Sequence, residues 1–566
     1  MKILFSGVYE VKEETKSLYL AVIASILIIF GVNHFFPAQT PTQNQEQTVA
    51  IPEVENIKAK EVVVSAVEPV EASVAANSQK NITVENKDIK GSIRVKGARF
   101  DYLTLSKYKQ TLEENSKNVE LLQPSLTLAP YFAEFGWLSS GADIILPDSE
   151  TEWKVIGEKL TPQTPVTLEW DNGQGLKFVK NISVDENYLF NVSQTVENNT
   201  QSPVVLYPYG LISRKVDMEQ QKRSVVHEGF SGVIEGSLKE VKFTDLDKQE
   251  NETFETKNGW FGFSDRYWFT AVVLDNDENA TVKISRNAND VFQTDYRGKA
   301  VTIATGGAAT SNVRFYAGAK EIKLLDKYTD ENKIEKFDLA VDFGWYYFLT
   351  KPFFYILTFL YNFIGNMGWA ILLFAALLRL VMFPIANASY ESMTKMKKIQ
   401  PKIMALQVLY KDDKMRLQQE TMELYRKEKI NPAAGCLPMF IQIPVFFSLY
   451  KVLNISIEIR HAPFIGWIKD LSAPDPLTVS VWSHIPLPSL LDIGVWPILM
   501  GLTMWIQQKL NPAPANKDQA RMFAMLPIIF TLMLGHFASG LVIYWTLSNI
   551  LSIMQQKAIM KKHGVK

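Results

Sequence analysis

The sequence of 566 residues contains a single cysteine, Cys436. An intrachain disulfide is therefore excluded, and the thiols do not indicate a redox compartment. A formal net charge of −1 gives no sign of a nucleic-acid partner. The chain also lacks a glycine-rich phosphate loop, an HExxH motif and a GxSxG motif. These absences argue against an enzyme, and we expect no cofactor and no metal.

Long apolar runs are present at both ends of the chain. Residues 17–36 form the first run, whose length suits one helix across a bilayer. A signal peptide is the alternative, but its apolar part is usually shorter. Lys2, Lys12 and Lys16 precede the run, which places the N-terminus in the cytoplasm by the positive-inside rule. We therefore predict an uncleaved anchor over residues 1–36.

The middle of the chain is polar. Residues 37–80 are rich in Gln, Pro, Glu and Ala and are predicted to be a flexible linker. Residues 81–341 alternate short β-branched and aromatic runs with turn residues such as Asn172-Gly173 and Asp185-Glu186-Asn187. This pattern predicts one large antiparallel β-sandwich outside the cytoplasm.

The apolar texture returns at residue 343. A helix over 343–385 would measure about 64 Å, twice the hydrocarbon thickness, so the segment must be divided. Interruptions at Lys351-Pro352 and Gly365-Asn366 predict an interfacial amphipathic helix over 342–366. Residues 367–384 then span inward.

Residues 386–432 are hydrophilic, with ten Lys or Arg against six Asp or Glu. This excess predicts a cytoplasmic loop. Apolar residues three and four apart predict an antiparallel helical hairpin with a coiled-coil-like seam, and Pro401 should kink its first arm.

Three further apolar blocks follow at residues 433–450, 490–508 and 522–554. The last is too long for one span, and residues 535–540 suit a turn. Dividing it predicts two helices of about 16 residues, short enough to thin the bilayer locally. Residues 561–566 form a basic cytoplasmic tail.

These segments predict a multi-domain membrane protein with an antiparallel β-sandwich outside the cytoplasm and an α-helical transmembrane core. Six spans are expected, with both termini in the cytoplasm. Five of them lie within residues 367–560.

Arg379 lies in the otherwise apolar stretch ILLFAALLRLVMFPI. Its guanidinium could snorkel to the headgroups, or it could face a wet cavity between helices, where intramembrane charges usually serve a pathway or pair with a partner. No Asp or Glu lies at similar depth in a neighbouring span, so a buried salt bridge is not expected.

Other spans supply polar or aromatic residues that could serve as helix–helix contacts or could together ring a hydrated groove. They are Gln442, Thr503, Gln507, Tyr544, Trp545, Ser548 and Asn549. A second set is the methionines of the hairpin: Met393, Met396, Met404, Met415 and Met422. Methionines suit a surface that accepts many apolar partners, but a plain hairpin core is an equal alternative.

Four stretches resemble the YidC family of membrane protein insertases: SYESMTKMKKIQPKIMALQ, INPAAGCLPMFIQIPVFFSLY, APFIGWIKDLSAPDP and ASGLVIYWTLSNILSIMQQ. The anchor and β domain resemble the Gram-negative form, whose periplasmic domain is similar to sugar-mutarotase sandwiches. The resemblance implies a five-helix core around a hydrophilic groove open to the cytoplasm and lipid. The groove arginine falls on Arg379, and polar or aromatic groove positions fall on Gln442, Gln507, Tyr544 and Trp545.

Two positions depart from the enteric pattern: Ala375 stands in place of a threonine, and Trp545 in place of a second tyrosine. The β domain also lacks the His/Glu set expected for mutarotation, so we interpret it as a scaffold or partner-binding module.

The resemblance implies a chaperone and insertase of the bacterial inner membrane, which inserts nascent membrane proteins and helps to fold and assemble them, alone or with the Sec translocon. The ribosome and the signal recognition particle receptor are further possible partners. Two other hypotheses are a small-solute transporter, for which no inverted repeat is visible, and a structural assembly factor for translocon complexes.

Overall fold

The computed structural model describes residues 71–565 except 126, 141–143, 223–225, 247–250, 275–278, 412, 432–436 and 513–516. The chain divides into two compact units, Met1–Glu55 and Asn56–Lys566. The predicted anchor and most of the predicted linker lie outside the described residues. At the end of that linker, Ala72–Asn77 forms helix α2 instead, because its three buried alanines can pack against the β domain that follows.

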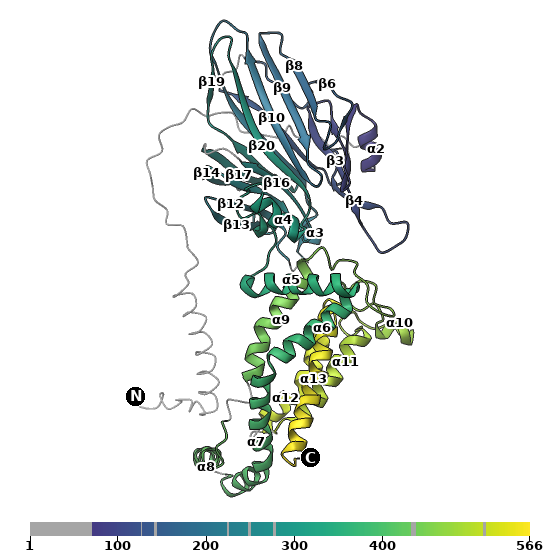
Figure 1. The fold of residues 1–566 in the computed structure, drawn as a ribbon, viewed down its shortest axis with the longest axis vertical. Coiled ribbons are helices and arrows are strands. Elements are labelled where there is room, and N and C mark those ends of the chain that lie inside the picture. The colour runs from purple at the N-terminus through teal and green to yellow at the C-terminus, as the bar shows by residue number, and fades with distance from the viewer. Residues whose placement is uncertain are drawn as a thin grey trace, which may run out of the picture. The chain divides into compact units, whose positions relative to one another are not determined.

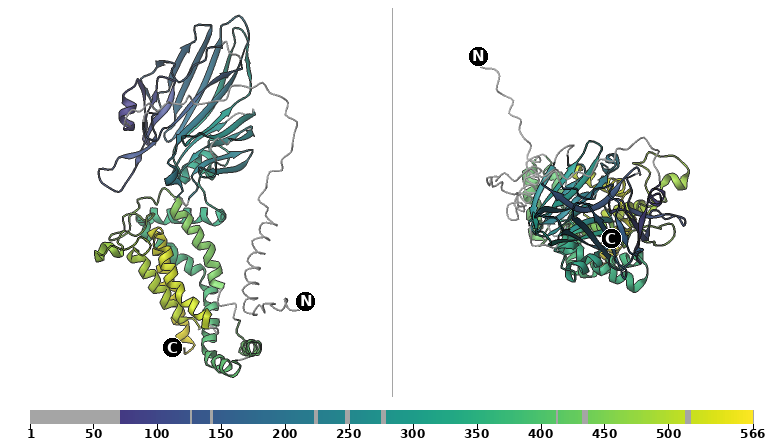
Figure 2. Two further views of the ribbon diagram at one scale, coloured as in Figure 1. Left: turned by 180° about the vertical axis from the view of Figure 1, so that it is seen from behind. Right: turned by 90° about the horizontal axis from the view of Figure 1, so that it is seen from above.

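Residues 81–341, called the β domain, form two sheets packed face to face (Figures 1 and 2). The strands of the first sheet are β1 (Asn81–Glu85), β2 (Ile89–Arg94), β3 (Arg99–Lys109), β4 (Asn118–Leu122), β5 (Tyr131–Ser139), β7 (Lys159–Leu160), β11 (Val204–Lys215), β14 (Asn251–Thr256), β17 (Ala280–Arg286), β18 (Val291–Arg297) and β19 (Val301–Ile303). Those of the second are β6 (Lys154–Ile156), β8 (Val166–Asp171), β9 (Leu176–Val184), β10 (Leu189–Asn198), β12 (Gly229–Ile234), β13 (Ser237–Lys242), β15 (Gly259–Ser264), β16 (Trp268–Leu274) and β20 (Ala308–Ala319).

The first sheet has the order β14-β17-β18-β11-β5-β3-β2-β1-β7, with β19 beside β11 and β4 beside β3. The second has the order β13-β12-β15-β16-β20-β10-β9-β8-β6. The predicted two-sheet, β-rich domain is confirmed. One pair differs from the predicted antiparallel pattern, because the short β7 runs parallel to β1.

The predicted turns join consecutive strands of the second sheet. Between β8 and β9, the Asn172 side-chain oxygen accepts from the backbone N–H groups of Gln174 and Leu176. Gly173 has a φ of 70°, which favours glycine. Asp185 accepts in the same way from two backbone N–H groups between β9 and β10. Such local bonds offer the backbone an alternative to the ladder and so end each strand.

Aromatic side chains from the two sheets meet in the core of the β domain. Phe100 of the first sheet lies 5.3 Å, centroid to centroid, from both Phe190 and Phe315 of the second. Because successive strand residues point to opposite faces, this core uses alternate positions, and β9 alternates between buried and more exposed residues along its length. Short helices α3 (Met218–Gln221), α4 (Ile322–Asp330) and the 3-10 turn η1 (Phe337–Ala340) complete the domain.

The helical region, residues 342–565, contains nine α-helices among its described residues (Figure 1). They are α5 (Tyr347–Ile364), α6 (Met367–Val381), α7 (Phe383–Leu409), α8 (Lys414–Lys427), α9 (Leu437–Ile455), α10 (Val479–Ser483), α11 (Val495–Leu510), α12 (Lys517–Leu534) and α13 (Ser539–Lys562). Helix α13 contacts α6, α7, α9 and α11, so it lies at the centre of the region.

The interruption predicted at Lys351-Pro352 is wrong. Helix α5 continues through Pro352, because the buried Phe353, Phe354 and Leu357 on one face stabilise it despite the lost backbone donor. Lys351 is part of this helix and bridges Asp326 (2.8 Å) and Asp338 (2.7 Å) of the β domain. The interruption predicted at Gly365-Asn366 is present.

The single inward span predicted over residues 367–384 is also divided. Helix α6 ends at Val381 and α7 begins at Phe383, and the two axes differ by 66°. Pro384 lies in the first turn of α7, where its missing N–H is not needed, and it cannot continue α6. Helix α7 then runs without a break through Pro401 into the predicted hairpin.

Among the described residues, no single helix is both long and apolar enough to cross a membrane, whereas the bent pair α6 and α7 meets that criterion together. The last apolar block divides between α12 and α13, as predicted. Their predicted length of 16 residues is wrong, since they have 18 and 24 residues. Both helices extend beyond the apolar block into polar sequence, α12 from Lys517 and α13 to Lys562.

Candidate functional site

Arg379 lies two residues before the end of α6, at the bend with α7. Its Nη2 donates to the hydroxyl oxygen of Tyr390 on α7 at 2.7 Å, and its guanidinium carbon lies 5.7 Å from the Tyr390 ring centroid. The Nε atom is buried and has no hydrogen-bond partner. Arg379 is thus turned toward α7 and is half-buried.

The electrostatic surroundings of Arg379 are unusual for a partly buried cation. Within the part of the chain that the structure describes, Tyr390 is its one hydrogen-bonding partner, and no carboxylate lies within ion-pair distance. The phenol hydroxyl of Tyr390 is an uncharged partner. The guanidinium charge is therefore positioned without being neutralised.

Two pairs of the predicted polar residues are brought together between helices. The Gln442 amide of α9 donates to the Tyr544 hydroxyl of α13 at 3.0 Å, and Tyr544 is buried. The Asn549 amide of α13 donates to the Thr503 hydroxyl of α11 at 3.1 Å. Such bonds join helices, so these residues serve as interhelical contacts whether or not they also touch a substrate.

The other predicted positions are placed differently. Trp545 lies in an aromatic cluster, with its ring centroid 4.7 Å from that of Phe446 on α9 and 5.9 Å from that of Phe530 on α12. Gln507 and Ser548 are half-buried on α11 and α13. Ala375, which stands where the enteric pattern has a threonine, is buried in α6.

Tyr390 and two members of a polar stripe on α13, Ser552 and Gln556, were not predicted from the sequence. Asn549, Ser552 and Gln556 are all buried and lie three and four residues apart, on one face of the helix. The side-chain oxygens of Gln555 and Gln556 are buried without partners, although their amides donate to Phe383 O and Asn511 Oδ1. The spacing was visible in the sequence and indicates a buried polar face.

The hairpin methionines separate into two groups. Met396 is buried with Ile399, Ile403 and Ile430 in a small apolar cluster, and Met393 packs against it. Met404, Met415 and Met422 are exposed. The first group therefore forms the hairpin core, whereas the second is available to a partner.

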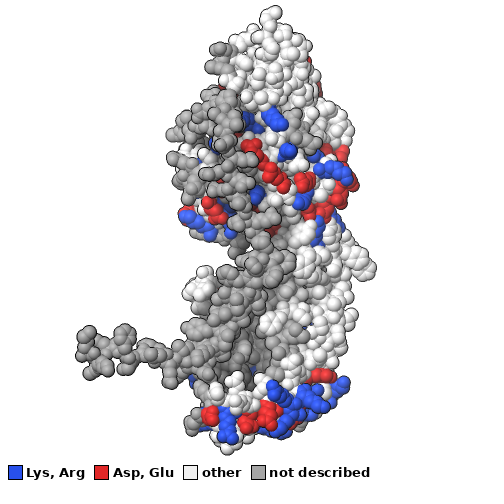
Figure 3. Space-filling model, turned by 90° about the vertical axis from the view of Figure 1, so that its left-hand side faces the viewer, with Lys and Arg blue, Asp and Glu red and all other residues white. Residues whose placement is uncertain are grey.

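Charged residues are concentrated at two places on the face shown in Figure 3. One lies over the β domain and the other over the end of the molecule that carries α7 and α8. The white surface between them has almost no charge on this face, which is the distribution expected of a chain that crosses hydrocarbon.

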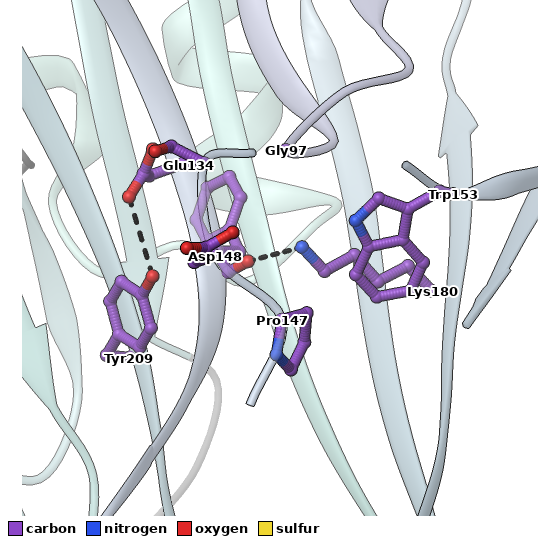
Figure 4. Close-up of a pocket in the computed structure, with 9 residues that line it drawn as sticks. Gly97, Glu134, Pro147, Asp148, Trp153, Lys180 and Tyr209 are labelled. Atoms are coloured by element: carbon purple, nitrogen blue, oxygen red, sulfur yellow. Dashed lines mark hydrogen bonds between the residues drawn. The ribbon is translucent and has the colours of Figure 1, made fainter. Parts of the chain in front are cut away.

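The β domain contains a small polar cavity of about 10 Å³, lined among others by Glu134, Asp148, Trp153, Lys180 and Tyr209 (Figure 4). The Lys180 Nζ donates to the Phe135 carbonyl at 2.5 Å, and the Tyr209 hydroxyl donates to Glu134 at 3.4 Å. A volume of this size holds about one water molecule. The cavity therefore does not accommodate a sugar or peptide.

The single histidine of the β domain, His227, is half-buried and lies 3.0 Å from the Phe230 carbonyl through Nε2. Burial lowers its pKa, so the ring is neutral at physiological pH. This environment indicates a packing role for His227.

The sequence matches two protein-family profiles, one described as the YidC periplasmic domain, over residues 81–356, and one described as the 60Kd inner membrane protein, over residues 359–566. The chain is 44% identical to the membrane protein insertase YidC of Beijerinckia indica, with 98% of this chain and 97% of that protein covered. It is also 44% identical to the membrane protein insertase YidC of Rickettsia bellii, with coverage of 96% and 98%.

A solved structure described as an active YidC insertase is 19% identical and covers 86% of this chain and 94% of its own, with a TM-score of 0.36. The identity and coverage of the relatives, together with the two profiles, leave one assignment. The chain belongs to the YidC family of membrane protein insertases of the inner membrane, with a periplasmic β-rich domain and a helical region, and it is not an enzyme.

Proposed function

We propose that Arg379 is the electrostatic centre of a substrate path for insertion, which receives the acidic flank of a nascent membrane protein. The observation that carries the proposal is the guanidinium with a neutral phenol partner and, among the described residues, no carboxylate. Such a cation can still attract an anion. The remaining groove positions in this proposal are Gln442, Gln507, Tyr544, Trp545 and Ser548.

The energetics require no covalent step. An acidic group near Arg379 is attracted more strongly than in bulk water, because the surroundings have a lower effective dielectric constant. The membrane potential adds about 2.3 kcal/mol per negative charge per 100 mV in the outward direction. The apolar part of the substrate then enters lipid, and each buried CH₂ contributes about 0.8 kcal/mol.

The hairpin is proposed as the first contact of the substrate. The exposed Met404, Met415 and Met422 offer flexible thioether side chains to apolar segments of varied sequence. Both α7 and α8 also carry lysine residues, and α8 carries two arginines. The neighbouring core residues Met393 and Met396 keep the two helices together.

The proposed topology has six spans, both termini in the cytoplasm and the β domain in the periplasm as a scaffold or partner-binding module. The excess of Lys and Arg in residues 386–432 supports a cytoplasmic hairpin. Proposed partners, besides nascent membrane proteins and lipid, are the Sec translocon, the ribosome and the signal recognition particle receptor.

Replacing Arg379 by alanine tests the electrostatic role. We expect Arg379→Ala to fold normally and to lower insertion of a substrate with two or three acidic tail residues about tenfold, or about 1.4 kcal/mol. A neutral-tailed substrate should be inserted as before. The measurement is protease protection of a tail-charge series inserted into proteoliposomes.

Arg379→Lys is the matched control, because it keeps the positive charge but loses the planar fork of donors. Arg379→Lys should rank the substrates of the tail-charge series in the same order of insertion as the wild type. Equal loss across all tail charges in Arg379→Ala, or no loss, would reject the attraction.

A further inference from the structure

We propose that Tyr390 is a positioning residue for insertion: it holds the Arg379 guanidinium as a neutral resting partner and yields it to the carboxylate of a substrate. This inference rests on the proposed role of Arg379. It adds a second residue to the site and explains how a charge without an ion pair is kept in one place.

The bend between α6 and α7 creates the contact. Tyr390 follows Arg379 by eleven residues, and in a straight helix the two side chains would lie about 16 Å apart along the axis. The 66° break after Val381 allows α7 to bring the phenol to Nη2. The main-chain geometry thus makes a pair that neither helix could make alone.

The burial of Tyr390 fixes the position of its hydroxyl. Only 4% of Tyr390 is exposed, and its ring packs with Ala386 and with Ile559 of α13. The ring therefore has little freedom to follow the guanidinium. Arg379 is the less buried member of the pair, so it is the group that can move.

The chemistry of the pair allows a carboxylate to replace the phenol as the partner of Arg379. A guanidinium has five N–H donors, and the Tyr390 oxygen takes one of them. The buried Nε–H has no acceptor. A carboxylate can accept two parallel bonds from a guanidinium and forms stronger, charge-assisted bonds than a phenol. A substrate carboxylate can therefore displace the phenol, whereas a resident Asp or Glu would have resisted displacement.

The test uses the ratio of insertion of an acidic-tailed substrate to that of a neutral-tailed substrate, in proteoliposomes with the full-length protein. Tyr390→Phe keeps the ring and removes the oxygen that holds the guanidinium in place. The free guanidinium must then be ordered when the carboxylate binds, so the ratio should fall about fivefold. Tyr390→Glu supplies a resident carboxylate. Its ratio should fall to that of Arg379→Ala.

Two controls separate positioning from packing. Ile559→Leu changes the contact with the Tyr390 ring while conserving volume, and it should leave the ratio unchanged. The double variant Arg379→Ala/Tyr390→Phe should show the same ratio as Arg379→Ala, because the phenol acts only through the guanidinium. Circular dichroism and the amount of membrane-integrated protein verify folding.

The outcomes are distinguishable. If Arg379→Ala lowers the ratio but Tyr390→Phe and Tyr390→Glu do not, the inference on Tyr390 is overturned and the role of Arg379 stands. Additive effects in the double variant would also overturn it. If Arg379→Ala itself leaves the ratio unchanged, the proposed function fails.

Discussion

Lys180 of β9 is a cation that folding removes from water. It is buried in the β domain, its Nζ donates to the Phe135 carbonyl, and it lies 4.7 Å above the centroid of the Trp153 ring. Burial lowers the pKa of Lys180 to about 8, and the nearby Glu134 carboxylate opposes this shift only in part. Lys180 is therefore still mainly charged at pH 7, but it loses its proton at a lower pH than an exposed lysine does.

The free energy of opening β9 should consequently depend on pH. An exposed lysine has a pKa near 10.5, so between pH 8 and 10.5 the open state binds more protons than the folded state. Stability must then rise with pH across this window, by an amount on the order of 3 kcal/mol. Hydrogen exchange of β9 amides in the detergent-solubilised protein, expressed as protection factors from pH 7 to 10, measures the rise.

Lys180→Met should remove the rise. Lys177→Met on the same strand is the matched control, since Lys177 pairs with Glu169 at 3.1 Å and the hydrogen bond to that carboxylate raises its pKa. This control should keep the wild-type rise. If the protection of β9 amides rose with pH in Lys180→Met as it does in the wild type, Lys180 would not be the group responsible.

Residue types at the candidate site could be predicted from sequence, but their partners could not. Arg379, Gln442 and Tyr544 were recognisable as polar or charged groups in apolar segments. Their pairing depends on helix directions after breaks, and the 66° bend was not predicted. Tyr390 could not be predicted for the same reason. Nothing in the sequence distinguishes it from other tyrosines, and only the bend between α6 and α7 brings it to Arg379.

At the scale of elements, the α7–α8 hairpin depends on a small apolar cluster. Ile403 is buried with Met396, Ile399 and Ile430, and across the hairpin Lys402 pairs with Glu428 at 2.6 Å. A cluster of this size contributes little surplus stability, so each member is important. The exposed salt bridge contributes little by itself.

We expect Ile403→Ala to open the hairpin locally. Replacing a buried isoleucine by alanine usually lowers the free energy of unfolding by about 2–5 kcal/mol. A cluster this small cannot lose that much and still hold the hairpin closed. Hydrogen exchange should accelerate in α8 and remain unchanged in the β domain. Met404→Ala, at the adjacent exposed position, should leave exchange unchanged. Unchanged protection of α8 in Ile403→Ala would show that other contacts hold the hairpin.

Element boundaries were predictable where the chain itself ends a helix. Gly365 has a φ of 78°, and the Asn366 side chain caps α6 by accepting from the Trp369 N–H at 3.1 Å, so both residues mark the break in the sequence. Prolines were less informative. Pro352 and Pro384 have the same intrinsic effect, but packing stabilises α5 across the first whereas α6 ends before the second.

At the scale of the whole molecule, two arginines join the β domain to the end of α9 and to the loop that follows it. Arg266 Nε donates to the Asn454 carbonyl at 2.6 Å, and Arg460 Nη2 donates to the carbonyls of Lys109 and Gln110 at 2.8 and 3.0 Å. Arg460 also stacks 5.4 Å from the Trp268 ring centroid. These contacts combine hydrogen bonds with cation–π attraction.

Arg460→Ala should broaden the distribution of distances between the two parts. Spin labels on the exposed Ala308 and Lys562, introduced after replacing the only cysteine, report that distribution by pulsed electron resonance. Lys109→Ala is the matched control, because Lys109 contributes only its backbone carbonyl to Arg460. An equal width in Arg460→Ala and wild type would show that this contact does not restrain the domain.

The central place of α13 has a consequence for biosynthesis. The helix that touches α6, α7, α9 and α11 is also translated after all of them. Until it is made, the earlier helices cannot acquire their shared packing partner and must wait in the bilayer incompletely assembled. The assembly of this helical region is therefore completed only when α13 has been made.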